Sequence, residues 1–141
     1  MKPMEMKVML DPGAKMPTRA HEYDAGLDLY TPVDALIYND DSVEIDTGVH
    51  VQIPRGYVGL VLSKSGLNFR HSVKSDGVID ADYTGSIRVK LYNHSDSAYH
   101  FRKGDKIIQL VLLPIITPEL ELVDSLEDTE RGEGGFGSTG R

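Results

Sequence analysis

The residues whose chemistry stands out most lie in residues 77–85, which read Gly-Val-Ile-Asp-Ala-Asp-Tyr-Thr-Gly. The Val-Ile pair favours an extended backbone, whereas Asp-Tyr-Thr-Gly is typical of a turn. Because apolar residues alternate again over residues 87–91, we predict a β-hairpin that carries Asp80, Asp82 and Tyr83 near its tip. A carboxylate held there could act as a general base, provided that it lies within hydrogen-bond reach of a nucleophilic water. A solvated turn without chemistry is the alternative for the hairpin taken alone.

Anion-binding chemistry is indicated by two basic clusters and by the C-terminal segment. The clusters are Lys64 with Arg70 and Lys74, and Arg102 with Lys103 and Lys106. In residues 131–141, an arginine, a phenylalanine and a Ser-Thr pair are separated by glycines. Glycines let backbone N–H groups converge on an anion, while hydroxyls and a guanidinium add further donors. The alternatives are ordinary surface cations and a disordered terminus. The segment also lacks the Gly-Lys-Ser/Thr ending of a P-loop.

Short extended segments must position these groups. Apolar and polar residues alternate in several segments, and no helical apolar period persists for about ten residues. The predicted strands cover residues 6–10, 25–30, 43–47, 49–53, 57–62, 106–116 and 120–123. Residues 65–71 lack β-branched side chains and are predicted to form one short helical turn. Short strands with regular turn signals predict an all-β fold, a single-domain jelly-roll-like distorted β-barrel.

Two of the predicted strands contain a conspicuous polar residue. Residues 106–116 form a nearly continuous apolar run, as in a strand buried on both faces, and Gln109 is the polar exception within it. Because a buried amide needs a hydrogen-bond partner, we expect Gln109 to bind a ligand or an interface. Asp28 lies in the alternating segment 25–30, on the face opposite Leu27 and Leu29. On local sequence alone, this aspartate could equally cap a turn.

The composition bounds the class of protein. The 141 residues are 40% hydrophobic and 26% charged and include no cysteine, as in a globular domain without disulfides or thiolate metal sites. The net charge of −7 argues against nucleic-acid backbone binding, and we expect neither a membrane span nor a signal peptide. We predict a cytoplasmic protein, or one of the host cytoplasm if the source is a phage or virus. We expect a domain of residues 1–125 and a flexible tail of residues 126–141.

Five stretches together resemble, in order and spacing, the five motifs of the trimeric deoxyuridine triphosphatase (dUTPase) family. They are residues 25–30, 63–68, 77–85, 103–110 and 131–140. The most specific read Gly-Val-Ile-Asp-Ala-Asp-Tyr-Thr-Gly and Arg-Gly-Glu-Gly-Gly-Phe-Gly-Ser-Thr-Gly. The resemblance implies a jelly-roll-like subunit, a homotrimer whose active sites are shared between subunits, and Mg²⁺-assisted hydrolysis of dUTP to dUMP and pyrophosphate. Such a dUTP diphosphatase lowers dUTP and supplies dUMP for thymidylate synthesis.

The resemblance implies roles for the residues of the predicted hairpin. Asp80 matches the catalytic carboxylate, which orients and deprotonates the water that attacks the α-phosphorus. Asp82 is expected to shape the turn. Tyr83 matches the residue that stacks on the sugar and leaves no room for a ribose 2′-hydroxyl. The residues expected to contact the base are Gly77, Val78, Ile79 and, across the hairpin from Gly77, Arg88.

Further roles are implied for the phosphate and metal contacts. Asp28 matches an aspartate that holds Mg²⁺ through water, as suits an ion that keeps several water ligands. The phosphate contacts implied in the first four motifs are Lys64, Ser65, Gly66 and Gln109. Those implied in the tail are Phe136, stacked on uracil, and Arg131, Gly137, Ser138 and Thr139, around the terminal phosphate. Lys64 departs from the arginine that usually begins the second motif, and lysine lacks the two-point guanidinium fork.

Two other functions on the same fold are kept as alternatives. A dCTP deaminase would need a glutamate beside the hairpin as a proton shuttle, and residues 77–85 contain none. A nucleotide-sensing regulatory protein would bind dUTP and a protein partner without hydrolysis. The presence of both Asp28 and Asp80 favours an enzyme over a pure binding protein.

Overall fold

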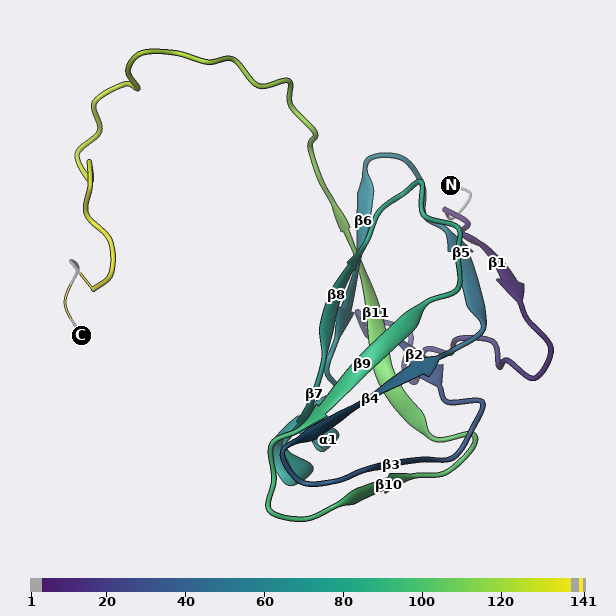
Figure 1. The fold of residues 1–141 in the computed structure, drawn as a ribbon. Helices are drawn as coiled ribbons and strands as arrows, with labels where there is room; N and C mark the ends of the chain where they lie inside the picture. Colours follow the sequence, from purple (N-terminus) through teal and green to yellow (C-terminus); the bar gives the residue numbers. More distant parts are fainter. Residues whose placement is uncertain (1–3, 138–139, 141) are drawn as a thin grey trace.

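The computed structural model describes residues 4–137 and residue 140, and these form a nearly all-β structure with one short helix (Figure 1). Its strands are β1 (Lys7–Leu10), β2 (Leu27–Tyr30), β3 (Ala35–Ile37), β4 (Asp41–Asp46), β5 (Val49–Gln52), β6 (Tyr57–Leu62), β7 (Val73–Lys74), β8 (Asp76–Ile79), β9 (Arg88–Asn93), β10 (Tyr99–Phe101) and β11 (Lys106–Pro114). Helix α1 spans Ser65–His71. The predicted all-β, jelly-roll-like class is confirmed, as is the short helical segment.

Strands that are distant in the sequence pair to form the sheets. One sheet has the order β2-β11-β6-β8, a second has β4-β9-β7, and the pairs β1-β5 and β3-β10 stand beside them. Among the described strands, none of these sheets closes into a barrel. A single hydrophobic core joins the sheets, with Leu29, Ile45, Leu91, Phe101 and Leu110 almost fully buried. The core therefore fixes how the two larger sheets face each other.

The side-chain pattern explains which strands face the core. β9 alternates exposed and buried residues, so that Val89 and Leu91 enter the core while charged neighbours remain outside. β11 begins with residues buried on both faces, but its C-terminal end is exposed. The strand also ends at Pro114, and Ile116 is 86% exposed. The prediction of a strand buried on both faces over residues 106–116 therefore holds only for the first half.

The predicted β-hairpin of residues 77–91 is wrong, because its two strands lie in different sheets. β8 pairs with β6, with Ile79 opposite Gly59, whereas β9 pairs with β4 and β7. The connecting loop is too long for a tight turn, and it crosses from one sheet to the other (Figure 1). The alternation of residues 87–91 correctly predicted a strand, but alternation does not identify the partner strand.

The predicted position of Arg88 across the hairpin from Gly77 is wrong for the same reason. Arg88 lies opposite Asp46 on β4. Its guanidinium is exposed, and Nη1 lies 3.5 Å from Oε1 of Glu44. Gly77 instead lies opposite Val61 on β6.

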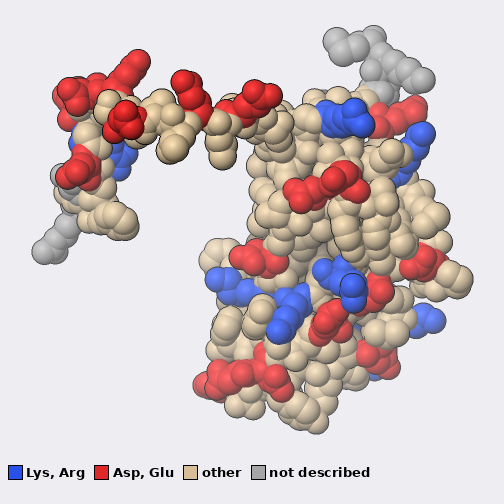
Figure 2. All heavy atoms as spheres, turned by 45° about the horizontal axis from the view of Figure 1, so that its top comes forward, with Lys and Arg blue, Asp and Glu red and all other residues tan. Residues whose placement is uncertain are grey.

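The predicted strand at residues 120–123 is also absent from the described part of the chain. Leu120 and Leu122 are 95% and 101% exposed, and no strand pairs with this segment. Residues 118–137, which we call the C-terminal arm, leave the body of the molecule after β11 (Figure 1). Acidic side chains follow one another along this arm (Figure 2). A strand needs a partner for its backbone, and the arm pairs with no strand of the described residues.

No helix among residues 4–137 is long and apolar enough to span a membrane.

Candidate active site

The buried carboxylate of Asp28 forms the centre of a charged cluster. Asp28 lies on β2 and is 5% exposed. Lys64 Nζ donates to its Oδ1, and Lys106 Nζ lies 3.1 Å from its Oδ2. Burial opposes ionisation of Asp28, but the hydrogen bonds and charges of the two lysines outweigh it and hold its pKa below the ordinary value. The site therefore contains an ionised, buried carboxylate between two ammonium groups.

Gln109 links three of the five motif stretches. In the sheet register it lies opposite both Asp28 on β2 and Leu62 on β6. Its Nε2 donates to the Ser63 carbonyl at 2.9 Å, so the expected partner of this amide lies within the chain. A Cβ added to Gly26 would lie 2.1 Å from Gln109 Oε1, and only glycine leaves room there. The stretches 25–30, 63–68 and 103–110 are therefore brought together as predicted.

Ser65 and Gly66 begin helix α1 beside this cluster. Both residues are exposed, and Lys64 is the N-cap residue without a side-chain cap. The first backbone N–H groups of a helix have no partner within it. Nothing lies within 4 Å of a Cβ added to Gly66, so no packing within the described chain requires a glycine there. The backbone N–H groups at the start of α1 are therefore accessible at Ser65 and Gly66.

Asp80 directly follows the C-terminal end of β8, in the loop that leaves the sheet, whereas the Gln109 row meets β8 at its N-terminal end. Its side chain is exposed, and Tyr83 N–H donates to its carbonyl at 3.0 Å, which closes a turn over residues 80–83. Asp80 and Asp82 line a hollow of about 840 Å³, together with Lys7, Arg55 and Tyr57. The predicted turn chemistry is therefore confirmed, and the carboxylate is free to meet a ligand.

Tyr83 folds back over its own loop. Its Oη donates to the Ser86 carbonyl at 2.7 Å, and a Cβ added to Gly85 would lie 2.6 Å from the same Oη. Tyr83 as a whole is 40% exposed. One face of a tyrosine is therefore supported by the backbone, while the remaining surface is open.

β8 presents an unpaired backbone edge. It is the outer strand of its sheet and pairs only with β6 among the described strands. Val78 is 64% exposed, whereas Ile79 is buried. The free N–H and C=O groups of an edge strand can bind an extended or planar ligand.

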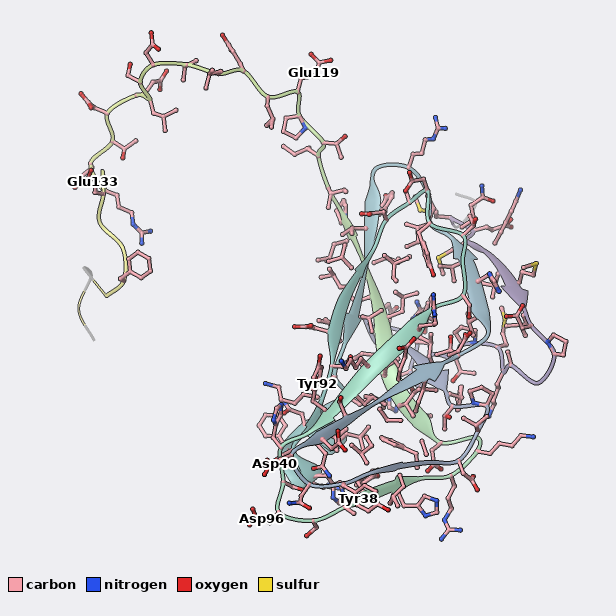
Figure 3. The ribbon with its side chains drawn as sticks, viewed as in Figure 1. Tyr38, Asp40, Tyr92, Asp96, Glu119 and Glu133 are labelled. Atoms are coloured by element: carbon pink, nitrogen blue, oxygen red, sulfur yellow. The ribbon has the colours of Figure 1, made fainter. Side chains whose placement is uncertain are left out.

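One chain does not bring all the candidate residues together. In the sheet register, Asp28, Gln109 and Leu62 lie in one row with Asp76 of β8. Asp80 follows Asp76 by four positions, just beyond the end of that strand. Three spacings between neighbouring strands separate β2 from β8, and four residues of strand rise separate Asp76 from Asp80. Together these two perpendicular displacements place Asp28 and Asp80 about 20 Å apart. The C-terminal arm, which includes Arg131, Phe136 and Gly137, extends away from the sheets, as the positions of Glu119 and Glu133 illustrate (Figure 3). Ser138 and Thr139 lie outside the described residues.

Some functional neighbours could not be predicted from the sequence. Lys106 was predicted only as part of a basic cluster, and its contact with Asp28 spans 78 positions of the chain. Gly26 gave a weak signal, as a glycine inside the predicted strand of residues 25–30. In the part of the chain that the structure describes, no group of three His, Cys, Asp or Glu side chains is arranged to hold a metal.

Comparisons with known proteins agree over nearly the full chain. The family model for dUTPase matches residues 13–140. A probable deoxyuridine 5'-triphosphate nucleotidohydrolase of Schizosaccharomyces pombe is 44% identical over 128 residues, covering 90% of this chain and 91% of the relative. The deoxyuridine 5'-triphosphate nucleotidohydrolase of Arabidopsis thaliana is 42% identical over 128 residues, covering 90% of this chain and 77% of the relative.

Solved structures show the same fold. A mutant dUTPase of Staphylococcus bacteriophage 80alpha with dUpNHpp superimposes with a TM-score of 0.92 and 34% identity, covering 97% of this chain and 99% of that one. A mutant dUTPase of phage phi11 of S. aureus, described with a structural Mg(II) ion, has a TM-score of 0.83 and 31% identity, covering 89% of this chain and all of the other. The fold and the sequence together define a dUTPase-type nucleotide hydrolase. The chain belongs to the dUTPase family.

Proposed function

We propose that the protein hydrolyses dUTP to dUMP and pyrophosphate, with Asp80 as the general base. The membership of the whole chain in the dUTPase family supports the reaction. The observation that carries the residue assignment is the position of Asp80, an exposed carboxylate directly after an edge strand with a free backbone. A water bound to this carboxylate attacks the α-phosphorus, Asp80 accepts its proton, and the bond from the α-phosphorus to the leaving pyrophosphate oxygen breaks.

The free edge of β8 is proposed to select uracil. Backbone groups of Gly77, Val78 and Ile79 have fixed donor and acceptor positions, because β6 holds the other edge of the strand. Uracil presents an N–H donor between two carbonyls, whereas cytosine presents an acceptor at that position and an amino group. A mismatched base leaves backbone groups unpaired, at a cost of about 1–3 kcal/mol for each lost bond. Tyr83, supported from behind by Ser86, is proposed to pack against the deoxyribose.

The phosphates are proposed to bind at the Asp28 cluster. The open backbone at Ser65 and Gly66 offers N–H donors, and Gln109 retains one amide N–H after its bond to Ser63. The Lys64 ammonium donates to the Asp28 carboxylate. Its role toward phosphate would therefore require the ammonium to be shared between the carboxylate and the ligand.

The donor set suits a magnesium ion that arrives with the nucleotide. Mg²⁺ in such sites keeps several waters and takes other ligands from phosphates, so a single carboxylate can hold it through water. Asp28 is ionised, and a carboxylate offers about four acceptor positions, of which its two lysines occupy part. When bound, the ion supplies charge neutralisation along the phosphates. The chain's own contribution is to keep Asp28 charged and fixed in orientation.

A homotrimer with shared sites is proposed because a single chain separates the two halves of the site. Asp28 and Asp80 are about 20 Å apart in one chain, which is too far for both to contact one triphosphate. The arm also exposes Leu120, Leu122 and Leu126 completely or nearly so. Apolar side chains of this kind are expected to be covered by a neighbouring subunit. Phosphate-binding residues of one copy would then meet the β8 edge of another.

The tail of residues 126–141 is proposed to close over the bound nucleotide. Phe136 is fully exposed, and the Arg131 Nε donates to the Gly134 carbonyl at 2.6 Å. That bond bends the backbone locally and leaves the terminal guanidinium nitrogens for phosphate oxygens. Closure would order the tail and exclude water from the reacting phosphates. We propose that this chemistry takes place in the cytoplasm, or in that of a host, where deoxynucleotides are used.

The proposal is tested by pyrophosphate release from dUTP, dCTP, dTTP and UTP, with and without Mg²⁺. We expect release from dUTP alone, and only with the metal. Asp80→Asn should bind the nucleotide but lose about 10²-fold or more in turnover. Asp82→Asn, which alters a neighbouring exposed carboxylate on the same turn, is the matched control and should retain turnover. Ammonia release from dCTP would instead favour a deaminase, and near-normal turnover in Asp80→Asn would reject Asp80 as the base.

A further inference from the structure

The loop of residues 80–86 carries the two groups closest to the proposed chemistry, Asp80 and Tyr83. Its C-terminal end is firmly fixed. The Oγ1 of Thr47, a fully buried residue, donates to the Ile87 carbonyl at 2.6 Å, and Ile87 N–H donates to the Val49 carbonyl at 2.8 Å. These bonds do not depend on pH. The Ser86 hydroxyl also donates to Oδ1 of Asp46. The middle of the loop, at Thr84, is held by a histidine side chain, which titrates.

That side chain is His50 of β5, which bridges the loop and the segment after β1. Its Nδ1 lies 2.8 Å from the Thr84 carbonyl oxygen, and its Nε2 lies 3.0 Å from Oδ1 of Asp11. The imidazole is 19% exposed. Both ring nitrogens are therefore used, one on each of two segments that are distant in the sequence.

The geometry requires a particular protonation state. A carbonyl oxygen accepts hydrogen bonds but donates none, and the same is true of an ionised carboxylate. Neutral imidazole has one N–H and one bare nitrogen, so it can satisfy either Thr84 or Asp11 but not both. Imidazolium donates from both nitrogens and satisfies both. Deprotonation of His50 must weaken one of the two contacts.

The charged groups around His50 favour the imidazolium. Asp11 faces it from the segment after β1, Asp46 acts on it from the end of β4, and Lys7 of β1 lines the same small cleft of about 210 Å³. Two carboxylates therefore oppose one ammonium. The bond to the Thr84 carbonyl, followed by the bond to Asp11, raises the pKa of His50 above its ordinary value.

We propose that protonated His50 is a positioning residue for the proposed dUTP hydrolysis, holding residues 80–86 in place through Thr84. Thr84 immediately precedes Gly85 and Ser86, the two residues against which Tyr83 rests. Loss of the bond to Thr84 frees this backbone, and the tyrosine that is proposed to pack on the sugar moves with it. His50 acts through the loop and does not touch the nucleotide. This inference rests on the proposed function, since the importance of the loop follows from it.

The direction of the pH effect follows from the charge state. The contact is complete below the ordinary histidine pKa of about 6.5, and it is lost as the pH rises through the raised pKa of His50. We therefore expect kcat/KM for dUTP to fall as the pH rises through the pKa of His50, mainly through a higher KM. His50→Gln carries its N–H donors on a single nitrogen and cannot reach both oxygens, which the two ring nitrogens of His50 contact on opposite sides. Its kcat/KM should therefore be about tenfold lower at pH 6 and no longer follow this titration.

The experiment combines two readouts on the full chain, and His21→Gln provides the control. His21 also pairs with a carboxylate, at 2.9 Å from Asp24 Oδ2, but in an exposed turn away from the loop. NMR titration of the imidazole nitrogens should show that both carry protons at pH 6. The amide signals of Gly85 and Ser86 should shift with the His50 midpoint in the unaltered protein and in His21→Gln, and lose that dependence in His50→Gln. Asp11→Asn should lower the midpoint.

The outcomes separate this inference from the proposed function. Amide signals of Gly85 and Ser86 that ignore the His50 titration would overturn the positioning role, even in an active enzyme. A His50→Gln variant with an unchanged pH profile of kcat/KM would overturn it as well. A protein that releases no pyrophosphate from dUTP at any pH would reject the proposed function, while the NMR titration would still decide whether His50 holds the loop.

Discussion

The tight contact between Gly26 and Gln109 gives the most quantitative prediction. An added Cβ at Gly26 would lie 2.1 Å from Gln109 Oε1, 3.0 Å from its Cδ and 3.1 Å from its Cβ. Three atoms of one side chain are too close, so rotation of the amide alone does not relieve the clash. Gln109 must leave its place and give up its 2.9 Å bond to the Ser63 carbonyl. We expect Gly26→Ala to cost about 1–3 kcal/mol from overpacking and about 1 kcal/mol from the lost bond.

A double-mutant cycle measures this contact directly. Gly26→Ala, Gln109→Ala and the double variant are unfolded with denaturant at one protein concentration, since the proposed assembly would make apparent stability depend on concentration. The double variant should be more stable than the sum of the single changes predicts, with a coupling of at least about 1 kcal/mol. Gly135→Ala is the control, because nothing lies within 4 Å of its added Cβ. Additive effects of Gly26→Ala and Gln109→Ala would refute the reasoning.

Two further predictions concern the charged cluster and the tyrosine. Because the pKa of Asp28 is held below its ordinary value, its contribution to stability is present above the unfolded pKa of about 3.8 and is lost as the pH falls through the folded pKa. Lys106→Met removes one of its two cations, so acid unfolding followed by circular dichroism should begin at a higher pH; an unchanged midpoint would contradict this account. Gly85→Ala should displace Tyr83 and raise KM for dUTP about tenfold with little change in kcat, and an unchanged KM would contradict the proposed sugar contact.

Local features of the fold were predictable from the sequence because they depend on nearby residues. The alternation and turn residues around β6 gave its bounds, Tyr57–Leu62, and the helical segment Ser65–His71 was also correct. The partner of β8 was not predictable, since the residues before and after its loop satisfy a hairpin pattern as well as a crossing between sheets. Local β-propensity likewise predicted a strand at residues 120–123, but this segment has no backbone partner among the described residues of the chain.

The candidate site was predictable in its residue types but not in its arrangement. The motif stretches identified Asp28, Gln109 and Asp80, and the sheet register brings the first two together. The lysines that hold Asp28 reach it from 36 and 78 positions away, a relationship that no local spacing encodes. The distance between Asp28 and Asp80 is likewise a property of the sheet order, because three strand spacings separate β2 from β8.

The central claim is that dUTP is hydrolysed at sites completed by neighbouring copies, and mixed trimers test it most directly. One variant carries Asp80→Asn, and the other lacks residues 126–141; each should assemble but show little pyrophosphate release alone. Random co-assembly at equal amounts should restore about a quarter of the sites, because half of the copies supply Asp80 and half supply a tail, independently. Activity near that fraction supports shared sites. Mixed assemblies as inactive as the two separate variants would contradict the account, since they would mean that Asp80 and the tail act within one chain.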